Sequence, residues 1–272
     1  MFKIGLSINK PNMNLSFFEE CAKAGIDCFE LSPAAEDNVG LDVRGICADI
    51  RRVGIEAWSY HLPFSPFSEL DISSPALVPY SLKLESEYIR RAGDAGIVNY
   101  VIHSSGEPID DTDRPMRMET AKESLYKLSV VAREAGGRIL VENLPRTVLG
   151  KNSDEVLELM SVHSDMRVVF DTNHLLSQDP IEFVKKVGAN IVSTHISDYD
   201  KIDEKHWLPG EGSADFYAIC RALGEVGFSG PWLYELSLTN TPKRTRSRDL
   251  TPFDIVRNAR EIFENKPLTV ID

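Results

Sequence analysis

Histidine and acidic side chains recur at one kind of position along this sequence. Each stands at or just after the end of a short β-rich run. The positions are His61, His103, Glu142, Asp171 with His174, His195 and Glu235. Carboxylates and imidazoles without a thiolate favour a divalent cation such as Mn, Mg, Co or Zn. The minimal ligand set for one such ion is Glu142, Asp171, His195 and Glu235.

The stretch HISDYDKIDEKHWLPGEG, residues 195–212, concentrates this chemistry. It follows an apolar run and contains two histidines, several acidic residues and a Pro-Gly-Glu-Gly turn. Alone, it fits either a solvated loop or one wall of a metal site. The choice depends on whether other segments bring matching groups to the same place.

Short β-rich runs alternate with helical patterns along the whole chain. The runs are 2–8, 28–32, 55–62, 100–105, 138–144, 166–174, 190–197 and 231–238. Such alternation predicts parallel strands joined by helices, and units of about 30 residues fill the usual length of a (β/α)8 barrel. No Gly-rich GxGxxG turn follows the first run, which disfavours a dinucleotide-binding sheet. We therefore predict an α/β fold, a (β/α)8 TIM barrel, as a single domain over residues 1–272.

In a barrel, the position of these residues at strand ends has a functional implication. Active-site groups of such barrels lie at the C-terminal ends of the strands and in the loops that follow. Five of the six histidines lie at such positions, His206 among them, and His163 at a predicted helix end is the exception. A lone histidine at a strand end is more often a packing residue. Six consecutive strands ending this way indicate a site, because burying such groups unpaired is costly.

Composition narrows the classes of function. A formal charge of −12 disfavours nucleic acid as a partner, since duplex-binding proteins present a basic face. The four cysteines show no CxxC pair, which is typical of reduced thiols. No signal peptide or membrane-length apolar run is visible. We expect a cytoplasmic protein with a small-molecule substrate and no membrane partner; a homo-oligomer remains compatible with the sequence.

Several motifs resemble one known group of proteins. They are VENLP, FDTNH, THISD, HWLPGEGSADF and YELS, in strand order over nearly the whole chain. The chain resembles the xylose isomerase-like TIM barrel superfamily, which includes sugar phosphate isomerases and epimerases and, more distantly, endonuclease IV. The resemblance to its ketose 3-epimerases implies that Glu142, Asp171, His195 and Glu235 hold one metal ion. It also implies that His174 contacts substrate and that His206 and the PGEG turn close the mouth of the site.

The chemistry implied is proton abstraction next to a sugar carbonyl through a metal-stabilised enediolate. Epimerisation needs a base on each face of the reacting carbon, and Glu142 and Glu235 are our expected acid/base pair. The alternative for this pair is metal ligation without proton transfer. Expected substrate contacts are His61, His103, His174, His206, Trp58 and Trp207, although ordinary core packing would equally explain each tryptophan.

A basic segment follows the last predicted strand. Lys243, Arg244 and Arg246 lie where many barrels hold a phosphate. A solvated loop is the favoured interpretation, because charge runs usually face water and no Gly-rich cradle accompanies this one.

Other activities use much the same residue types. An endonuclease IV-like zinc phosphodiesterase would use His61, His103, Glu142, Asp171, His174, His195, His206 and Glu235, with Glu204 where that family has Asp. A keto-sugar lyase or hydratase would share the enolate chemistry. A non-catalytic sugar-binding barrel would bind ligand without proton exchange.

Overall fold

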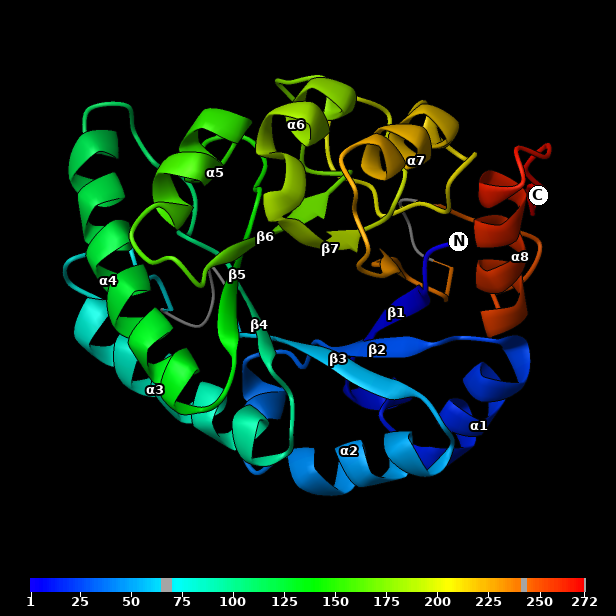
Figure 1. Cartoon of the computed structure of the whole chain (residues 1–272), viewed down its shortest axis with the longest axis horizontal. Coiled ribbons are helices and arrows are strands. Elements are labelled where there is room, and N and C mark those ends of the chain that lie inside the picture. The colour runs from blue at the N-terminus through cyan, green and yellow to red at the C-terminus, as the bar shows by residue number, and fades with distance from the viewer. Residues whose placement is uncertain (65–69, 241–243, 272) are drawn as a thin grey trace.

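The computed structural model describes residues 1–64, 70–240 and 244–271. Its centre is a ring of eight parallel strands surrounded by helices (Figure 1). The strands are β1 Ile4–Ile8, β2 Cys28–Leu31, β3 Glu56–His61, β4 Asn99–Ile102, β5 Arg138–Glu142, β6 Arg167–Asp171, β7 Ile191–His195 and β8 Trp232–Tyr234. The single-domain (β/α)8 barrel predicted from the alternation is confirmed.

Helices follow the strands around the ring. They are α1 Leu15–Ala24, α2 Val43–Arg52, α3 Val78–Asp94, α4 Arg114–Glu134, α5 Ser153–Met160, α6 Pro180–Val187, α7 Phe216–Glu225 and α8 Pro252–Phe263, with 3-10 turns at Lys10–Asn12, Glu36–Asn38 and Gly188–Asn190. Local sequence sets their ends. In α1, the Asn14 side chain accepts a hydrogen bond from the Phe17 amide, and Gly25 ends the helix at φ 100°, where glycine has no Cβ penalty.

The barrel closes between β7 and β8. The strand order runs β7-β6-β5-β4-β3-β2-β1-β8, so these two strands form the seam. The Ile196 amide donates to the Leu233 carbonyl at 2.8 Å, and the Glu235 amide donates to the Ile196 carbonyl at 3.2 Å. The seam thus fixes Glu235 beside the end of β7.

Strand alternation aims the polar residues into the barrel. Successive side chains of a strand point to opposite faces, so residues two apart share a face. Three mutually packed valine and leucine side chains stand two positions before three of the polar residues at the mouth. The pairs are Val101 and His103, Leu140 and Glu142, and Val169 and Asp171. The polar set forms the next layer above this apolar one.

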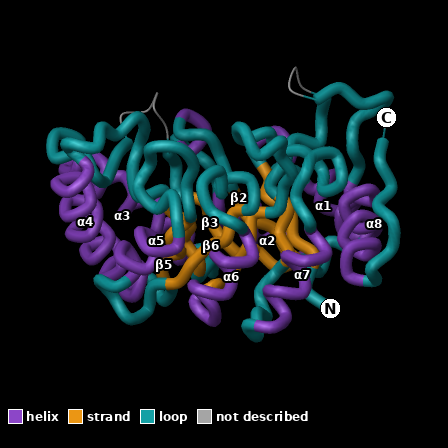
Figure 2. The backbone as a smooth tube through the Cα atoms, turned by 90° about the horizontal axis from the view of Figure 1, so that it is seen from above, coloured by secondary structure: helices purple, strands orange, loops and turns teal. Residues whose placement is uncertain are grey.

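Most apolar side chains pack between the strands and the surrounding helices. Trp232, Phe170 and Phe183 are among the largest fully buried ones. Figure 2 shows the longer loops gathered at the end of the barrel opposite the N-terminus. None of the described helices is long and apolar enough to cross a membrane.

Candidate metal centre and active site

Four side chains from the ends of β5 to β8 converge. One ligand atom from each of Glu142, Asp171, His195 and Glu235 lies within 4.8 Å of those of the others. His195 Nδ1 lies 2.9 Å from Glu142 Oε1, 3.5 Å from Glu235 Oε2 and 3.7 Å from Asp171 Oδ2. Three of the four are fully buried, and the Glu235 side chain is 20% exposed.

Glu142 is surrounded by imidazoles. Its Oε2 lies 3.2 Å from Nε2 of both His61 and His103. Its Oε1 lies 2.9 Å from His195 Nδ1 and 3.3 Å from His174 Nδ1. Histidines from four strand ends or adjoining loops therefore meet one carboxylate.

The hydrogen bonds of the Asp171 carboxylate indicate whether these residues suit a cation. Its Oδ1 accepts hydrogen bonds from the amides of Asn173 and His174, at 2.6 and 3.1 Å. Its Oδ2 is buried and has no hydrogen-bond partner, which is costly for a carboxylate oxygen. That oxygen lies among the ligand atoms of Glu142, His195 and Glu235. A divalent cation would satisfy it, so the donor set fits the metal expected from the sequence.

The crowding also perturbs protonation. Burial would raise the pKa of Glu142, but the charge of His195 and hydrogen bonds from His103 and His174 hold it well below its ordinary value. Burial raises the pKa of Asp171 well above normal. Burial acts to lower the pKa of His61, but its hydrogen bond to Glu142 outweighs this and raises the pKa to about 9. The positive charge on the protonated histidines thus offsets the negative charge of the carboxylates at the place where a cation would lie.

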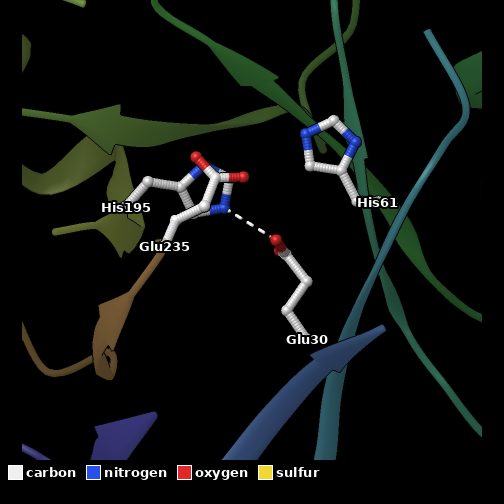
Figure 3. Close-up of side chains that lie close together, drawn as sticks. All are labelled: Glu30, His61, His195 and Glu235. Atoms are coloured by element: carbon white, nitrogen blue, oxygen red, sulfur yellow. Dashed lines mark ion pairs between the residues drawn. The ribbon is translucent and has the colours of Figure 1, made fainter. Parts of the chain in front are cut away.

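Glu30, inside β2, reaches the centre from the opposite side of the barrel (Figure 3). It is fully buried, and its Oε1 lies 2.9 Å from His195 Nε2. Hydroxyl groups of Ser7 and Ser59 donate to the same carboxylate at 3.2 and 2.8 Å. His195 therefore has carboxylates beside both ring nitrogens.

The stretch 195–212 forms part of the mouth. Asp198 is buried and accepts hydrogen bonds from the Gly210 and Gly212 amides of the PGEG turn, from the Ala214 amide just after it and from the amide of its own neighbour Tyr199. Asn173 Oδ1 accepts from the Lys205 amide at 2.9 Å, which ties this loop to the end of β6. The segment is thus a strand end carrying His195, followed by a loop that places His206 over the site.

Arg146, in the loop after β5, joins neighbouring loops. Its guanidinium pairs with Glu107, Asp203 and Glu204 at distances of 2.6 to 2.7 Å. The other Glu204 oxygen lies 3.0 Å from His174 Nε2. Burial opposes ionisation of Glu204, but His174 and Arg146 lower its pKa to about 2. The Glu204 carboxylate thus connects the rim to the candidate metal centre.

A cavity of about 210 Å³ opens above the centre. Its polar lining includes His103, His174, Glu204, His206 and Glu235, and its apolar lining includes Phe64, Leu70, Ile72, Leu144 and Val148. The Phe64 ring stacks on His103 with centroids 3.7 Å apart. Glu142 does not line the cavity and lies behind His103 and His174.

Some expected contacts lie elsewhere. Trp58 is early in β3, where its indole donates to the Ser193 hydroxyl at 3.3 Å and lies below Lys3, so it is away from the mouth. Trp207 pairs its backbone with Asp198 and does not line the cavity. Neither tryptophan lines the cavity, and substrate contact by either stays a prediction.

The basic segment also differs from expectation. The Arg246 guanidinium is 2% exposed and binds Glu211 through two contacts of 2.7 Å. Arg244 Nε lies 3.3 Å from the same carboxylate. These ion pairs anchor the loop to the PGEG turn, so the buried Arg246 differs from the solvated loop that the sequence favours. Lys243 lies outside the described residues.

Two buried carboxylates near the site were not identified by the sequence analysis. Glu30 interrupts an otherwise apolar strand, and that interruption is the signal that marks it. Glu85, on α3, lines the cavity and is 2% exposed, and its Oε2 has no hydrogen-bond partner. Burial raises its pKa well above normal. A glutamate in a polar helix carries no comparable sequence signal.

Residues 18–253 match the family model described as xylose isomerase-like TIM barrel. The chain belongs to this family. Among curated relatives of this xylose isomerase-like barrel, an uncharacterized protein of Methanocaldococcus jannaschii is 30% identical over 115 residues, 39% of each chain. An inosose dehydratase of Clostridium botulinum is 29% identical over 130 residues, 40% of this chain and 43% of the relative. Both matches span less than half of the relative.

Solved structures extend the similarity of the fold over the full barrel. A D-tagatose 3-epimerase-like protein superposes with a TM-score of 0.80 at 21% identity, covering 97% of this chain and 98% of the other. At this identity the likeness concerns the fold.

Proposed function

We propose that the protein is a divalent-metal-dependent isomerase or epimerase acting on a sugar or a related hydroxy-carbonyl compound. The observation that carries this proposal is the buried Asp171 Oδ2, which makes no hydrogen bond and lies among ligand atoms of Glu142, His195 and Glu235, next to a cavity. The epimerase-like solved structure and the inosose dehydratase relative support a sugar substrate.

The protein's own groups would bind the substrate and move the proton. The four ligands would hold a cation, which when bound would polarise the substrate carbonyl and stabilise negative charge on its oxygen. Glu235 lines the cavity and its pKa is lowered, because the positive charge of His195 outweighs burial. It is therefore a carboxylate at neutral pH and the better placed base. Glu142 does not line the cavity and lies behind His103 and His174, so its proposed role is that of a ligand, and Glu235 carries the role of the base.

The cavity favours a substrate without phosphate. Arg146 is the one lysine or arginine among the described residues that line it. Its guanidinium already binds Glu107, Asp203 and Glu204. Phosphate recognition normally uses a fork of donors that is open to the ligand. A neutral polyhydroxy carbonyl compound fits the histidine and glutamate lining better.

A second candidate is a phosphodiesterase with several zinc ions. Two further groups of potential ligands favour it, namely His61, His103 and Glu142, and His174, Glu204 and His206. Glu204 supplies a carboxylate where the sequence departs from endonuclease IV, so the departure does not remove a ligand. The net charge of −12 opposes DNA binding.

The test is proton exchange in ²H₂O with the Mn²⁺-loaded protein and a panel of ketoses, followed by NMR. We expect deuterium at the carbon next to the carbonyl, together with an epimeric or isomeric sugar. Loss of water from the sugar would instead indicate a dehydratase. Binding without exchange would indicate a non-catalytic barrel. Cleavage of abasic DNA by the zinc-loaded protein, with no exchange into any ketose, would replace the proposal with the second candidate.

A further inference from the structure

Glu30 is a buried acid that packing does not explain. Its neighbours in β2, Phe29 and Leu31, are fully buried apolar residues, and Glu30 itself is 0% exposed. Burying a carboxylate without a charged partner is strongly unfavourable. Two serine hydroxyls bind it, and His195 is the cationic group with which it pairs among the described residues.

The two edges of the His195 ring face different groups. Nδ1 faces Glu142, Asp171 and Glu235, the other proposed ligands. Nε2 lies 2.9 Å from Glu30 Oε1 (Figure 3). The ring N–H does not point straight at this oxygen, so the contact is a close charge pair short of a linear hydrogen bond.

A neutral imidazole carries a proton on one nitrogen only, and a metal binds the other. A carboxylate beside Nε2 favours the proton there and leaves the Nδ1 lone pair for the cation. Ligating histidines usually donate their second N–H to such a partner, which fixes both tautomer and ring orientation. Ser7 and Ser59 in turn hold both oxygens of Glu30 in place.

We propose that Glu30 is a positioning residue that fixes His195 as an Nδ1 ligand of the divalent cation. This inference rests on the metal site of the proposed function. His195 would hold the cation through Nδ1, and Glu30 would keep the ring proton on Nε2, 2.9 Å from its carboxylate. The hydroxyl groups of β1 and β3 complete a chain of contacts from the barrel wall to the metal.

Calorimetric titration with Mn²⁺ tests this for the parent, Glu30→Gln and Glu30→Leu. We expect Glu30→Leu to bind about 10- to 100-fold more weakly, the range typical for loss of such a partner. Glu30→Gln should lose less, because its amide oxygen still accepts from Nε2. The matched control is Glu85→Gln, a buried carboxyl that does not contact His195, and it should bind like the parent.

The second measurement is ¹⁵N NMR of the histidine rings in the Zn²⁺-loaded proteins. The parent should show His195 protonated at Nε2, and this signal should weaken or shift to mixed protonation in Glu30→Leu and recover in Glu30→Gln. Unchanged affinity in both Glu30 variants would overturn the inference. Weaker binding with unchanged His195 protonation would also overturn it, because the effect would then be charge alone.

The two proposals fail in different ways. A parent protein that binds no divalent cation would overturn the proposed function and this inference together. A parent that binds Mn²⁺ while the Glu30 variants match it would overturn this inference alone. If Glu30→Leu does not fold, judged by circular dichroism, the comparison of Glu30→Gln with Glu85→Gln decides.

Discussion

The metal-free protein should lose stability as the pH rises from neutrality. His61 is 2% exposed, and its hydrogen bond to Glu142 raises its pKa from 6.5 to about 9. The folded state therefore holds this proton more tightly than the unfolded state does. The resulting stabilisation is complete below pH 6.5 and is lost as the pH rises through 9.

The shift of His61 sets the size of the effect. A change of one pKa unit corresponds to about 1.4 kcal/mol, so this group contributes about 3 kcal/mol. Raised pKa values of His174 and His195, caused by the surrounding carboxylates against the effect of burial, act in the same direction. Burial lowers the pKa of His103, so its contribution has the opposite sign and falls mainly below pH 6.5, outside this window.

Urea unfolding at pH 6.5 and 9.5, with and without EDTA, measures this dependence. The chelated parent should lose about 3 kcal/mol or more of unfolding free energy. The Mn²⁺-loaded protein should lose less, because the metal displaces these protons and binds better as pH rises. Glu142→Gln removes the partner of His61 and should flatten the chelated curve. Equal stability of the chelated parent at both pH values, or the same slope in Glu142→Gln, would refute the reasoning.

Three further substitutions test other parts of the site. Glu235→Gln should fold normally yet slow deuterium exchange by about 10²- to 10⁴-fold, and parent-like exchange would remove Glu235 as the base. Arg146→Ala should raise KM while costing less than about 1 kcal/mol in urea unfolding, because its ion pairs are one-third exposed; a large stability loss with unchanged KM would contradict this. Asp198→Ala leaves the turn amides without their acceptor and should cost about 3 kcal/mol by thermal unfolding, with Asn restoring part; a parent-like melting temperature would show that the turn does not depend on it.

The barrel could be predicted because each strand and each helix has its own residue pattern within a short stretch of sequence. Strand ends in a barrel converge by construction, so residues far apart in sequence, such as His61 and Glu142, could be placed together without any knowledge of contacts. The contact at 3.2 Å between these two side chains agrees with that placement. Their roles in metal binding and catalysis stay predictions.

Other features depend on packing that the sequence does not reveal. Trp58 lies three residues before His61, which is about 10 Å of strand, so closeness in sequence to His61 does not bring it to the cavity. Arg246 pairs with Glu211, 35 residues earlier, and a run of basic residues does not identify such a partner. Glu85 reaches the cavity from a helix, whereas the strand-end rule covers only strands and the loops after them.

The central claim is that one divalent cation is held by Glu142, Asp171, His195 and Glu235. Metal content per chain, measured on protein purified without added metal or chelator, tests it most directly. We predict one ion per chain, lost in Asp171→Asn and retained in His61→Ala and His103→Ala. Two or three zinc ions per chain, with loss of metal when His61 or His103 is removed, would contradict the account and favour phosphodiester chemistry.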